Sequence, residues 1–289
     1  MLQEFLNTAY EGLVYAFTAL IFFFIGKVVY QLLNKSIDVK QELVKKDNLA
    51  FSIAHVGYFI GLLLAIGSAI VGPSQGLWMD VEMIAIYASL AIVLLNVSML
   101  FTDKVLLRKF KVRKEIIEDQ NVGTGIIEGS VSIAIGLIIF GAVTGEGNGD
   151  LMSGIHLAIG FWLSGLLSLI LVFRVYNMIT PYDIHEHIEK GNVAVGVGLA
   201  GAIIAMGNLI RFGLSGDFES WSTSLTEAGL EIGIGMIMLP VMRYLTDKIL
   251  LPGEKLTDEI INQEHPNIGA AIVEAFGYIG GSVLITWCF

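Results

Sequence analysis

Residues 121–143 read NVGTGIIEGSVSIAIGLIIFGAV, and residues 267–289 read NIGAAIVEAFGYIGGSVLITWCF. Each stretch begins with an asparagine, carries a glutamate seven residues later, and is otherwise largely apolar and rich in glycine. About 20 predominantly apolar residues are enough for a helix to cross the hydrocarbon core of a bilayer. The two stretches therefore predict membrane-spanning helices of one kind, placed far apart in the chain.

Comparable apolar stretches occupy most of the sequence. We expect spans at residues 10–33, 48–71, 81–107, 121–143, 151–178, 192–214, 224–251 and 267–289. The composition agrees, because 55% of the 289 residues are hydrophobic and only 15% are charged, and the mean hydropathy is +0.73. A segment in lipid has to satisfy its own backbone hydrogen bonds, so these spans should be helices. The sequence therefore predicts an all-α integral membrane protein of about eight transmembrane helices.

Lysine and arginine gather on alternate loops between the spans. Four lysines fall between the first two spans, and residues 108–114 after the third span carry five more basic residues. The loops near residues 73–80, 145–150 and 215–221 contain no lysine or arginine, and Arg211 alone lies towards them. By the positive-inside rule the basic loops are cytoplasmic and both termini lie outside. We expect a multi-pass protein of the bacterial inner (cell) membrane.

The two halves of the chain repeat each other. Thr102-Asp103-Lys104 matches Thr246-Asp247-Lys248 (246 − 102 = 144), and Asn48-Leu49-Ala50 matches Asn192-Val193-Ala194 at the same offset. Each half has an even number of spans, so both insert the same way up as parallel four-helix repeats. We place the repeats at residues 1–146 and 147–289. We expect a rotation of about 180° around the membrane normal to relate them.

Several of these motifs are shared with a known family. They are Thr180-Pro181-Tyr182-Asp183, Glu186, Gly191-Asn192-Val193-Ala194-Val195 and Gly201 in the second half, and Asp38, Glu42, Asn48-Leu49-Ala50 and Gly57 in the first. Through them nearly the whole chain resembles the bacterial membrane family catalogued as domain of unknown function 350. The first half departs from the pattern at residues 36–38, which read SID where the second half has TPYD. The resemblance implies one or two four-helix units and supplies no catalytic residue.

Four asparagines stand where the even-numbered spans begin, namely Asn48, Asn121, Asn192 and Asn267. A side-chain oxygen there can accept a hydrogen bond from an N–H group of the first helical turn. The alternative is that the four helix starts, whose positive dipole ends face the cytoplasm, bind an anion or a carboxylate. Capping explains the choice of asparagine without a ligand, so we favour it.

Glu128 and Glu274 are a repeated pair of acidic residues within spans. Each lies seven residues past a capping asparagine, about 10 Å into the helix at about 1.5 Å per residue. A carboxylate at that depth should face protein or water. One interpretation is a structural carboxyl group bonded across the bundle, for example to Lys27. The other is a proton or cation pathway, because a buried glutamate can take up a proton near neutral pH.

Two aspartates extend this candidate pathway. Asp103 and Asp247 lie at the cytoplasmic ends of the third and seventh spans, each followed by a lysine. A structural role is the alternative, in which each aspartate pairs with that lysine or, for Asp247, with Arg243. The second half alone adds a candidate outer polar cluster of Arg211, Glu227 and Glu231.

The sequence carries no pattern typical of an enzyme. It has no nucleotide-binding loop, no nucleophile with a base beside it, and no histidine or cysteine spacing for a metal. Cys288 is the single cysteine, and the net charge of −10 argues against nucleic acid as a partner. We therefore expect no enzymatic activity, no cofactor and no metal.

Two functional hypotheses remain. The first is a small transporter or an ion- or proton-conducting protein that uses the paired carboxylates. The second is a non-transporting scaffold that binds lipids or membrane partner proteins, with residues 108–114 on anionic headgroups. A homo-oligomer would fit either hypothesis. A water-accessible cavity reaching Glu128 and Glu274 would favour transport, and a dry, fully packed bundle would favour the scaffold.

Overall fold

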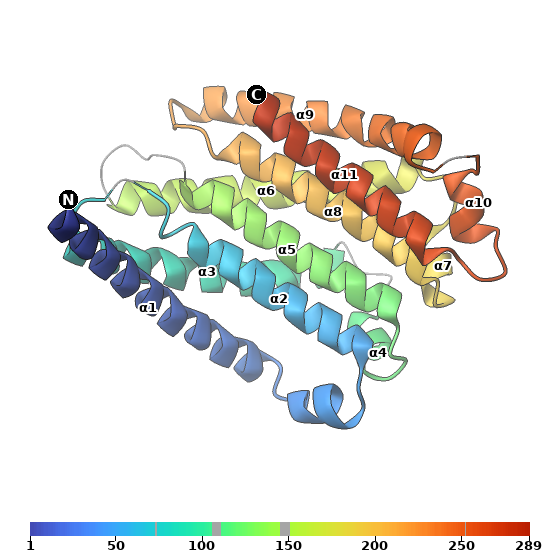
Figure 1. Cartoon of the computed structure of the whole chain (residues 1–289), viewed down its shortest axis with the longest axis horizontal. Coiled ribbons are helices and arrows are strands. Elements are labelled where there is room, and N and C mark those ends of the chain that lie inside the picture. Colours follow the sequence, from blue (N-terminus) through green and yellow to red (C-terminus); the bar gives the residue numbers. More distant parts are fainter. Residues whose placement is uncertain (73, 106–110, 145–150, 252) are drawn as a thin grey trace.

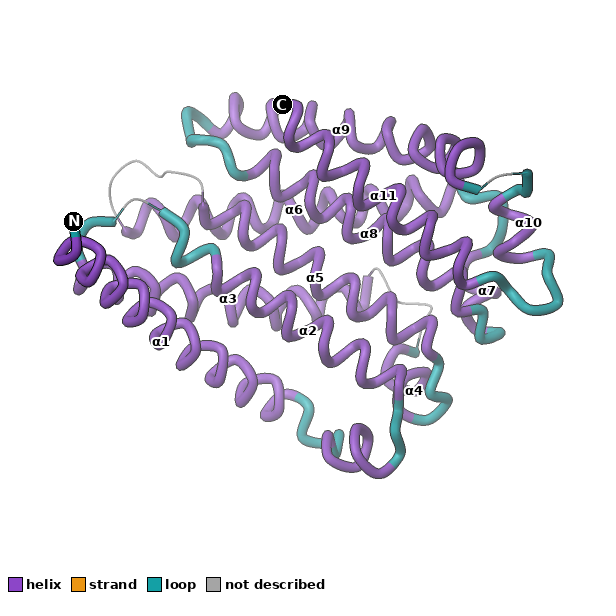
Figure 2. The backbone as a smooth tube through the Cα atoms, in the orientation of Figure 1, coloured by secondary structure: helices purple, strands orange, loops and turns teal. Residues whose placement is uncertain are grey.

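The computed structural model describes residues 1–72, 74–105, 111–144, 151–251 and 253–289, and within them every regular element is helical (Figure 2). Eight of the described helices are long and apolar enough to cross a membrane, which confirms the expected fold class. They are α1 (Leu2–Leu33), α2 (Leu49–Gly67), α3 (Leu77–Val105), α5 (Val122–Thr144), α6 (Leu151–Ile179), α8 (Val193–Leu214), α9 (Trp221–Leu245) and α11 (Ile268–Cys288).

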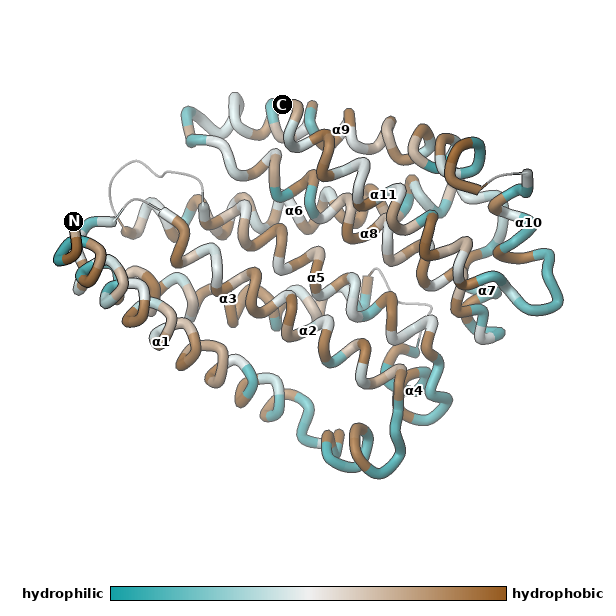
Figure 3. The backbone as a smooth tube through the Cα atoms, in the orientation of Figure 1, coloured by the Kyte–Doolittle hydropathy of each residue, from teal (hydrophilic) through white to brown (hydrophobic). Residues whose placement is uncertain are grey.

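Short helical elements precede the even-numbered spans. They are the π-helix η1 (Gln41–Lys45), α4 (Val112–Ile117), α7 (Ile184–Glu189) and α10 (Leu256–Ile261), and a second π-helical turn, η2 (Thr246–Leu250), extends α9. Figure 1 shows α4, α7 and α10 together at one end of the bundle. We call this the short-helix end (residues 34–48, 111–121, 180–192 and 253–267). Hydrophilic residues gather in its loops (Figure 3).

The long helices form two layers. In one layer α2 packs along α5, α5 along α8 and α8 along α11 (Figure 1). These four helices all begin at the short-helix end, so they run parallel to one another. The other layer holds α1, α3, α6 and α9, of which α3, α6 and α9 each contact two neighbouring helices of the row. Each odd-numbered span after the first therefore sits over the groove between two row helices.

This row corrects the expected relation between the halves. A rotation of 180° around the membrane normal would exchange the two layers from one half to the other. Instead the halves meet through α5 and α8, in the same way that α2 meets α5 and α8 meets α11. The halves therefore follow one another along the row, and within each half two hairpins of two spans follow one another in the same way. The expected boundary between residues 146 and 147 lies outside the described residues.

Small residues bring the row helices into backbone contact. A Cβ atom added at Gly196 of α8 would lie 2.8 Å from the Cα atom of Gly123 in α5. One added at Gly207 would lie 2.7 Å from the Cα atom of Ala134. Membrane helices commonly associate through such small residues, because lipid offers no hydrophobic driving force for burying larger apolar side chains. These glycines therefore allow the helices of the row to pack with their backbones in contact.

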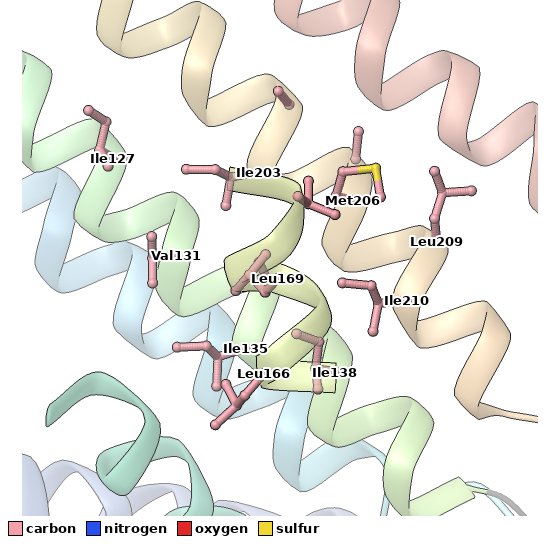
Figure 4. Close-up of a cluster of buried hydrophobic side chains, with 14 of the residues drawn as sticks. Ile127, Val131, Ile135, Ile138, Leu166, Leu169, Ile203, Met206, Leu209 and Ile210 are labelled. Atoms are coloured by element: carbon pink, nitrogen blue, oxygen red, sulfur yellow. The ribbon is translucent and has the colours of Figure 1, made fainter. Parts of the chain in front are cut away.

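Branched apolar side chains fill the space between the layers. Figure 4 shows those of α5, α6 and α8 pointing toward one another, namely Ile127, Val131, Ile135, Ile138, Leu166, Leu169, Ile203, Met206, Leu209 and Ile210. These helices belong to different halves, so the halves share one continuous core.

Candidate functional site

The four asparagines cap their helices. The Oδ1 atom of each accepts a hydrogen bond from the backbone N–H three residues on, with distances of 3.0 Å at Asn48, 3.3 Å at Asn121, 3.1 Å at Asn192 and 3.0 Å at Asn267. The other polar atom, Nδ2, donates to protein as well. Three of the four donate to a backbone carbonyl of the next hairpin, at Ile116, Ile188 and Ile260. Both polar atoms of each asparagine are therefore bonded to protein rather than presented to a ligand.

Glu274 is fully buried and paired. Its side chain has 0% exposure, and Oε1 accepts hydrogen bonds from Nη1 of Arg243 at 2.7 Å and from the hydroxyl of Tyr278 at 3.2 Å. Its Oε2 atom lies against Gly198 of α8, where a Cβ atom would come within 2.5 Å of it. The guanidinium of Arg243 therefore supplies the positive charge that this buried carboxylate requires.

Aromatic rings surround that ion pair. The guanidinium carbon of Arg243 lies 5.9 Å from the ring centre of Tyr182, and the rings of Tyr176 and Tyr278 lie 6.2 Å apart. Tyr182 lies in the loop before α7, where burial and then the charge of Glu274 raise its pKa to about 12. Its hydroxyl therefore stays protonated at neutral pH. The second half thus holds a guanidinium cation between a carboxylate and tyrosines.

Asp247 is also bonded within the protein. Its Oδ1 atom accepts the backbone N–H of Leu256 at 2.7 Å, at the first residue of α10. Its Oδ2 atom lies 3.7 Å from Nζ of Lys248. The pairing with Arg243 that its spacing suggested is not formed, because Arg243 turns to Glu274 instead. Each acidic residue of the second half therefore has at least one partner in the protein, although Oε2 of Glu274 is buried without a hydrogen-bond partner among the described residues.

Their counterparts in the first half line a cavity. Glu128 and Asp103 both contribute to a space of about 340 Å³. Oε2 of Glu128 and Oδ1 of Asp103 are buried, and neither has a hydrogen-bond partner in the described part of the chain. The sequence predicts equal depths for Glu128 and Glu274. In the structure this cavity reaches Glu128 but not Glu274.

The rest of the cavity lining mixes aromatic and polar side chains with aliphatic ones such as Leu100 and Ile116. It includes Tyr30 of α1, Tyr58 of α2 and Asn96 of α3, and the hydroxyl of Tyr58 bonds to Asn96. Asn34 and Arg113 line it at the short-helix end. The cavity therefore lies at the end of the bundle that carries the basic loops.

One substitution accounts for much of the contrast between the halves. Met99 stands where Arg243 stands in the second half (243 − 99 = 144). It lies beside Ser132, the counterpart of Tyr278 (278 − 132 = 146), with 3.3 Å between Sδ and Oγ. Among the described residues no guanidinium therefore takes the place of Arg243 beside Glu128; Arg113, which lines the cavity, donates to Oγ of Ser36 instead. Aligning the two halves at these offsets reveals the replacement of Arg243 by Met99. The positions of the spans and of the capping asparagines do not reveal it.

The remaining candidate residues are not brought together. Lys27 is exposed on α1, and no ion pair joins it to Glu128 within the described ranges. Nε of Arg211 donates to Asn208 at 3.2 Å, and among the described residues no ion pair joins Arg211 to Glu227 or Glu231. Glu231 instead places Oε2 against Gly213 of α8, where a Cβ atom would lie 3.1 Å from it. Of the basic loop, residues 108–110 lie outside the described residues.

Comparisons with known proteins agree with this architecture. A family model described as Domain of Unknown Function (DUF350) matches residues 2–143 and again residues 150–289. A UPF0719 transmembrane protein of Aquifex aeolicus (strain VF5) is 22% identical over 268 residues, which cover 92% of this chain and 96% of that protein. The UPF0719 transmembrane protein YshE of Bacillus subtilis (strain 168) is 28% identical over 102 residues, or 35% of this chain and 72% of that protein. No solved structure matches the chain.

Proposed function

The chain belongs to the Domain of Unknown Function (DUF350) family in two tandem copies, and we propose that this membrane protein passes a proton or a small cation through a site at Glu128 and Asp103. The observation that carries the proposal is the cavity of about 340 Å³ that both side chains line, where each has a buried oxygen without a partner in the described residues. Ionisable groups inside a membrane are costly and commonly mark ion or proton pathways.

The second copy supports the proposal by contrast. Its carboxylates have a guanidinium, a backbone N–H and a lysine as partners. The matching carboxyl groups of the first copy lack such partners in the described residues. Two carboxyl groups that share one cavity can be neutralised by protons or by a bound cation. Either event would load the site with the proton or cation to be transported.

The site's access also suits a transporter. We propose that the short-helix end faces the cytoplasm, because the basic loops lie there. A second hollow of about 500 Å³, lined by Tyr15, Asp80 and Tyr87, lies towards the opposite end. Between the two hollows the first copy is packed with residues such as Leu95 and Ile135, each 0% exposed. Passage would therefore require the helices to rearrange around the site, as in alternating access.

Flux measurements test the proposal. Purified protein in proteoliposomes should move protons or monovalent cations down an imposed gradient, as followed by an internal pH dye and by ion-selective electrodes. Glu128→Gln and Asp103→Asn should abolish that flux, because the amides keep size and hydrogen bonding but cannot ionise. Glu227→Gln, at an exposed glutamate of α9, is the matched control. Undiminished flux in the Glu128→Gln/Asp103→Asn double variant would exclude the site, and absence of flux in the wild type would favour a non-transporting scaffold.

A further inference from the structure

The second copy shows which cation this kind of site accommodates. The Arg243 guanidinium donates to the Glu274 carboxylate at 2.7 Å and lies over the Tyr182 ring at 5.9 Å. A guanidinium is planar, keeps its charge, and both bonds carboxylates and packs on aromatic faces. This site therefore binds a guanidinium that happens to belong to the chain itself.

The first copy repeats the site without that guanidinium. Glu128 takes the place of Glu274 (274 − 128 = 146), and Tyr30 of α1 lines the cavity with it. Met99 replaces Arg243, and the surrounding space is the cavity of about 340 Å³. The cavity thus has the carboxylate of the second-copy site, aromatic side chains of its own at Tyr30 and Tyr58, and room for a ligand. Tyr182 and Tyr278 have no aromatic counterpart there, since residues 36–38 read SID and Ser132 stands in the place of Tyr278.

We infer that this cavity binds a small guanidinium-type organic cation from solution, in the position that Arg243 fills in the second copy. The inference rests on the proposed function in that it names the class of cation taken up at Glu128 and Asp103. A space of this size falls in the range of small-molecule pockets, about 300–1,000 Å³. It exceeds what a proton or a bare metal ion needs.

The donor set also favours an organic cation over a hard metal ion. Mg²⁺ and Ca²⁺ take about six to eight oxygen ligands at short range, and the described residues contain no group of three or more acidic, histidine or cysteine side chains placed to hold a metal. The rings of Tyr30 and Tyr58 lie 4.5 Å apart, centre to centre. Their faces can contribute cation–π attraction to a polyatomic cation.

Binding of methylguanidinium chloride to the purified full chain tests the inference. Isothermal titration at constant ionic strength should give one saturable site in the wild type, and sodium or potassium chloride should not compete for it. Glu128→Gln should weaken binding by at least about tenfold, because a charge-assisted hydrogen bond is lost. Glu227→Gln, at a glutamate exposed on α9, should bind as the wild type does.

A reciprocal exchange between the copies makes the test sharper. Met99→Arg should tether a guanidinium beside Glu128 and abolish methylguanidinium binding. Arg243→Met should open the second-copy site and raise the stoichiometry from one to two. Methylguanidinium should also restore part of the thermal stability that Arg243→Met loses. If Arg243→Met does not fold, the Met99→Arg and Glu128→Gln variants still decide the question.

The outcomes separate this inference from the proposed function. Absence of saturable methylguanidinium binding in the wild type, or unchanged binding in Met99→Arg, would overturn the inference. If proton or sodium flux then still depends on Glu128, the proposed transport stands and only the cation class is wrong. Binding without any flux would retain the site and reject transport.

Discussion

Nδ2 of Asn48 donates a 2.9 Å hydrogen bond to the backbone carbonyl oxygen of Ile116, which belongs to the next hairpin. The same bond recurs twice along the row, at 2.8 Å and at 2.9 Å, from Asn121 to Ile188 and from Asn192 to Ile260. One side chain therefore caps its own helix and fixes the short helix of its neighbour. The last asparagine, Asn267, is exposed and donates instead to Oε2 of Glu259 in its own hairpin.

Asn192→Ala and Asn267→Ala should therefore differ in cost. Each loses a cap, worth about 1 kcal/mol. Asn192→Ala also leaves the carbonyl of Ile260 without its buried donor, which adds about 1–2 kcal/mol. We expect the free energy of unfolding to fall about two to three times as far for Asn192→Ala. Thermal and denaturant unfolding in detergent would measure both, and equal losses would contradict the link between hairpins.

These asparagines show what the sequence can and cannot reveal. Asn121 stands before a long apolar run, so both the span and its cap follow from local pattern. Its Nδ2 atom donates to the backbone carbonyl of Ile188. Every residue has a backbone carbonyl, so the amino acid at position 188 does not predict this bond. The expected two-fold relation failed for a related reason. The sequence matches relate one half to the other, but they do not show which helices of the two halves are neighbours. In the structure each hairpin packs against the next one along the row.

The candidate site divides in the same way. Apolar periodicity and the capping asparagines placed Glu128 and Glu274 at one depth. The difference between their surroundings comes from Arg243 and Met99, which lie on other helices. Which helix faces which carboxylate depends on packing across the two layers, so span positions alone could not pair Arg243 with Glu274 rather than with Asp247.

The close contact between α5 and α8 predicts a strong effect of Gly196→Val. A Cβ atom at Gly196 would lie 2.8 Å from the Cα atom of Gly123, which is backbone and cannot turn aside. Forcing these helices apart should cost about 1–3 kcal/mol or prevent folding. Gly233→Val is the matched control, because a Cβ atom at Gly233 meets nothing within 4 Å. A lower melting temperature for Gly196→Val alone is expected; equal melting temperatures would reject the glycine contact as a determinant of stability.

The ion pair between Arg243 and Glu274 predicts a coupled pair of variants. Arg243→Leu leaves the buried Glu274 carboxylate without its counter-charge, which should cost about 3–5 kcal/mol. Glu274→Gln in the same chain removes the unpaired charge and keeps a hydrogen-bond acceptor for Tyr278. The double variant should therefore be more stable than Arg243→Leu alone. Unfolding measured for both single variants and the double variant gives the coupling, and additive losses would exclude it.

Glu42 predicts an acid-dependent loss of stability. Burial raises the pKa of the Glu42 carboxyl. Hydrogen bonds from Lys46 at 2.7 Å and from Asn48 at 2.9 Å together lower that pKa by more than burial raises it, so the net pKa lies below its usual value. A depressed pKa stabilises the fold fully above the unfolded value of about 4.3, and the contribution is lost as pH falls through the folded value.

Glu42→Gln should accordingly flatten the decline of the melting temperature between about pH 6 and about pH 3. It should also lower the melting temperature at neutral pH, because the charged acceptor for Lys46 and Asn48 is lost. Glu227→Gln, at an exposed glutamate of α9, should change neither. An unaltered acid profile in Glu42→Gln would show that another group governs it.

The membrane orientation is the last prediction. Single cysteines at Ser74 and Ser215 should react with an impermeant thiol reagent added to intact cells, and cysteines at Ser36 and Lys111 should react only after permeabilisation. The background needs Cys288→Ser, because the native cysteine is exposed at the end of α11. The physical reason is that basic loops are retained on the cytoplasmic side during insertion, and Ser36 and Lys111 lie among those loops. The reverse labelling pattern would turn the cavity at Glu128 towards the outside, whereas labelling of all four positions in intact cells would indicate insertion in both orientations.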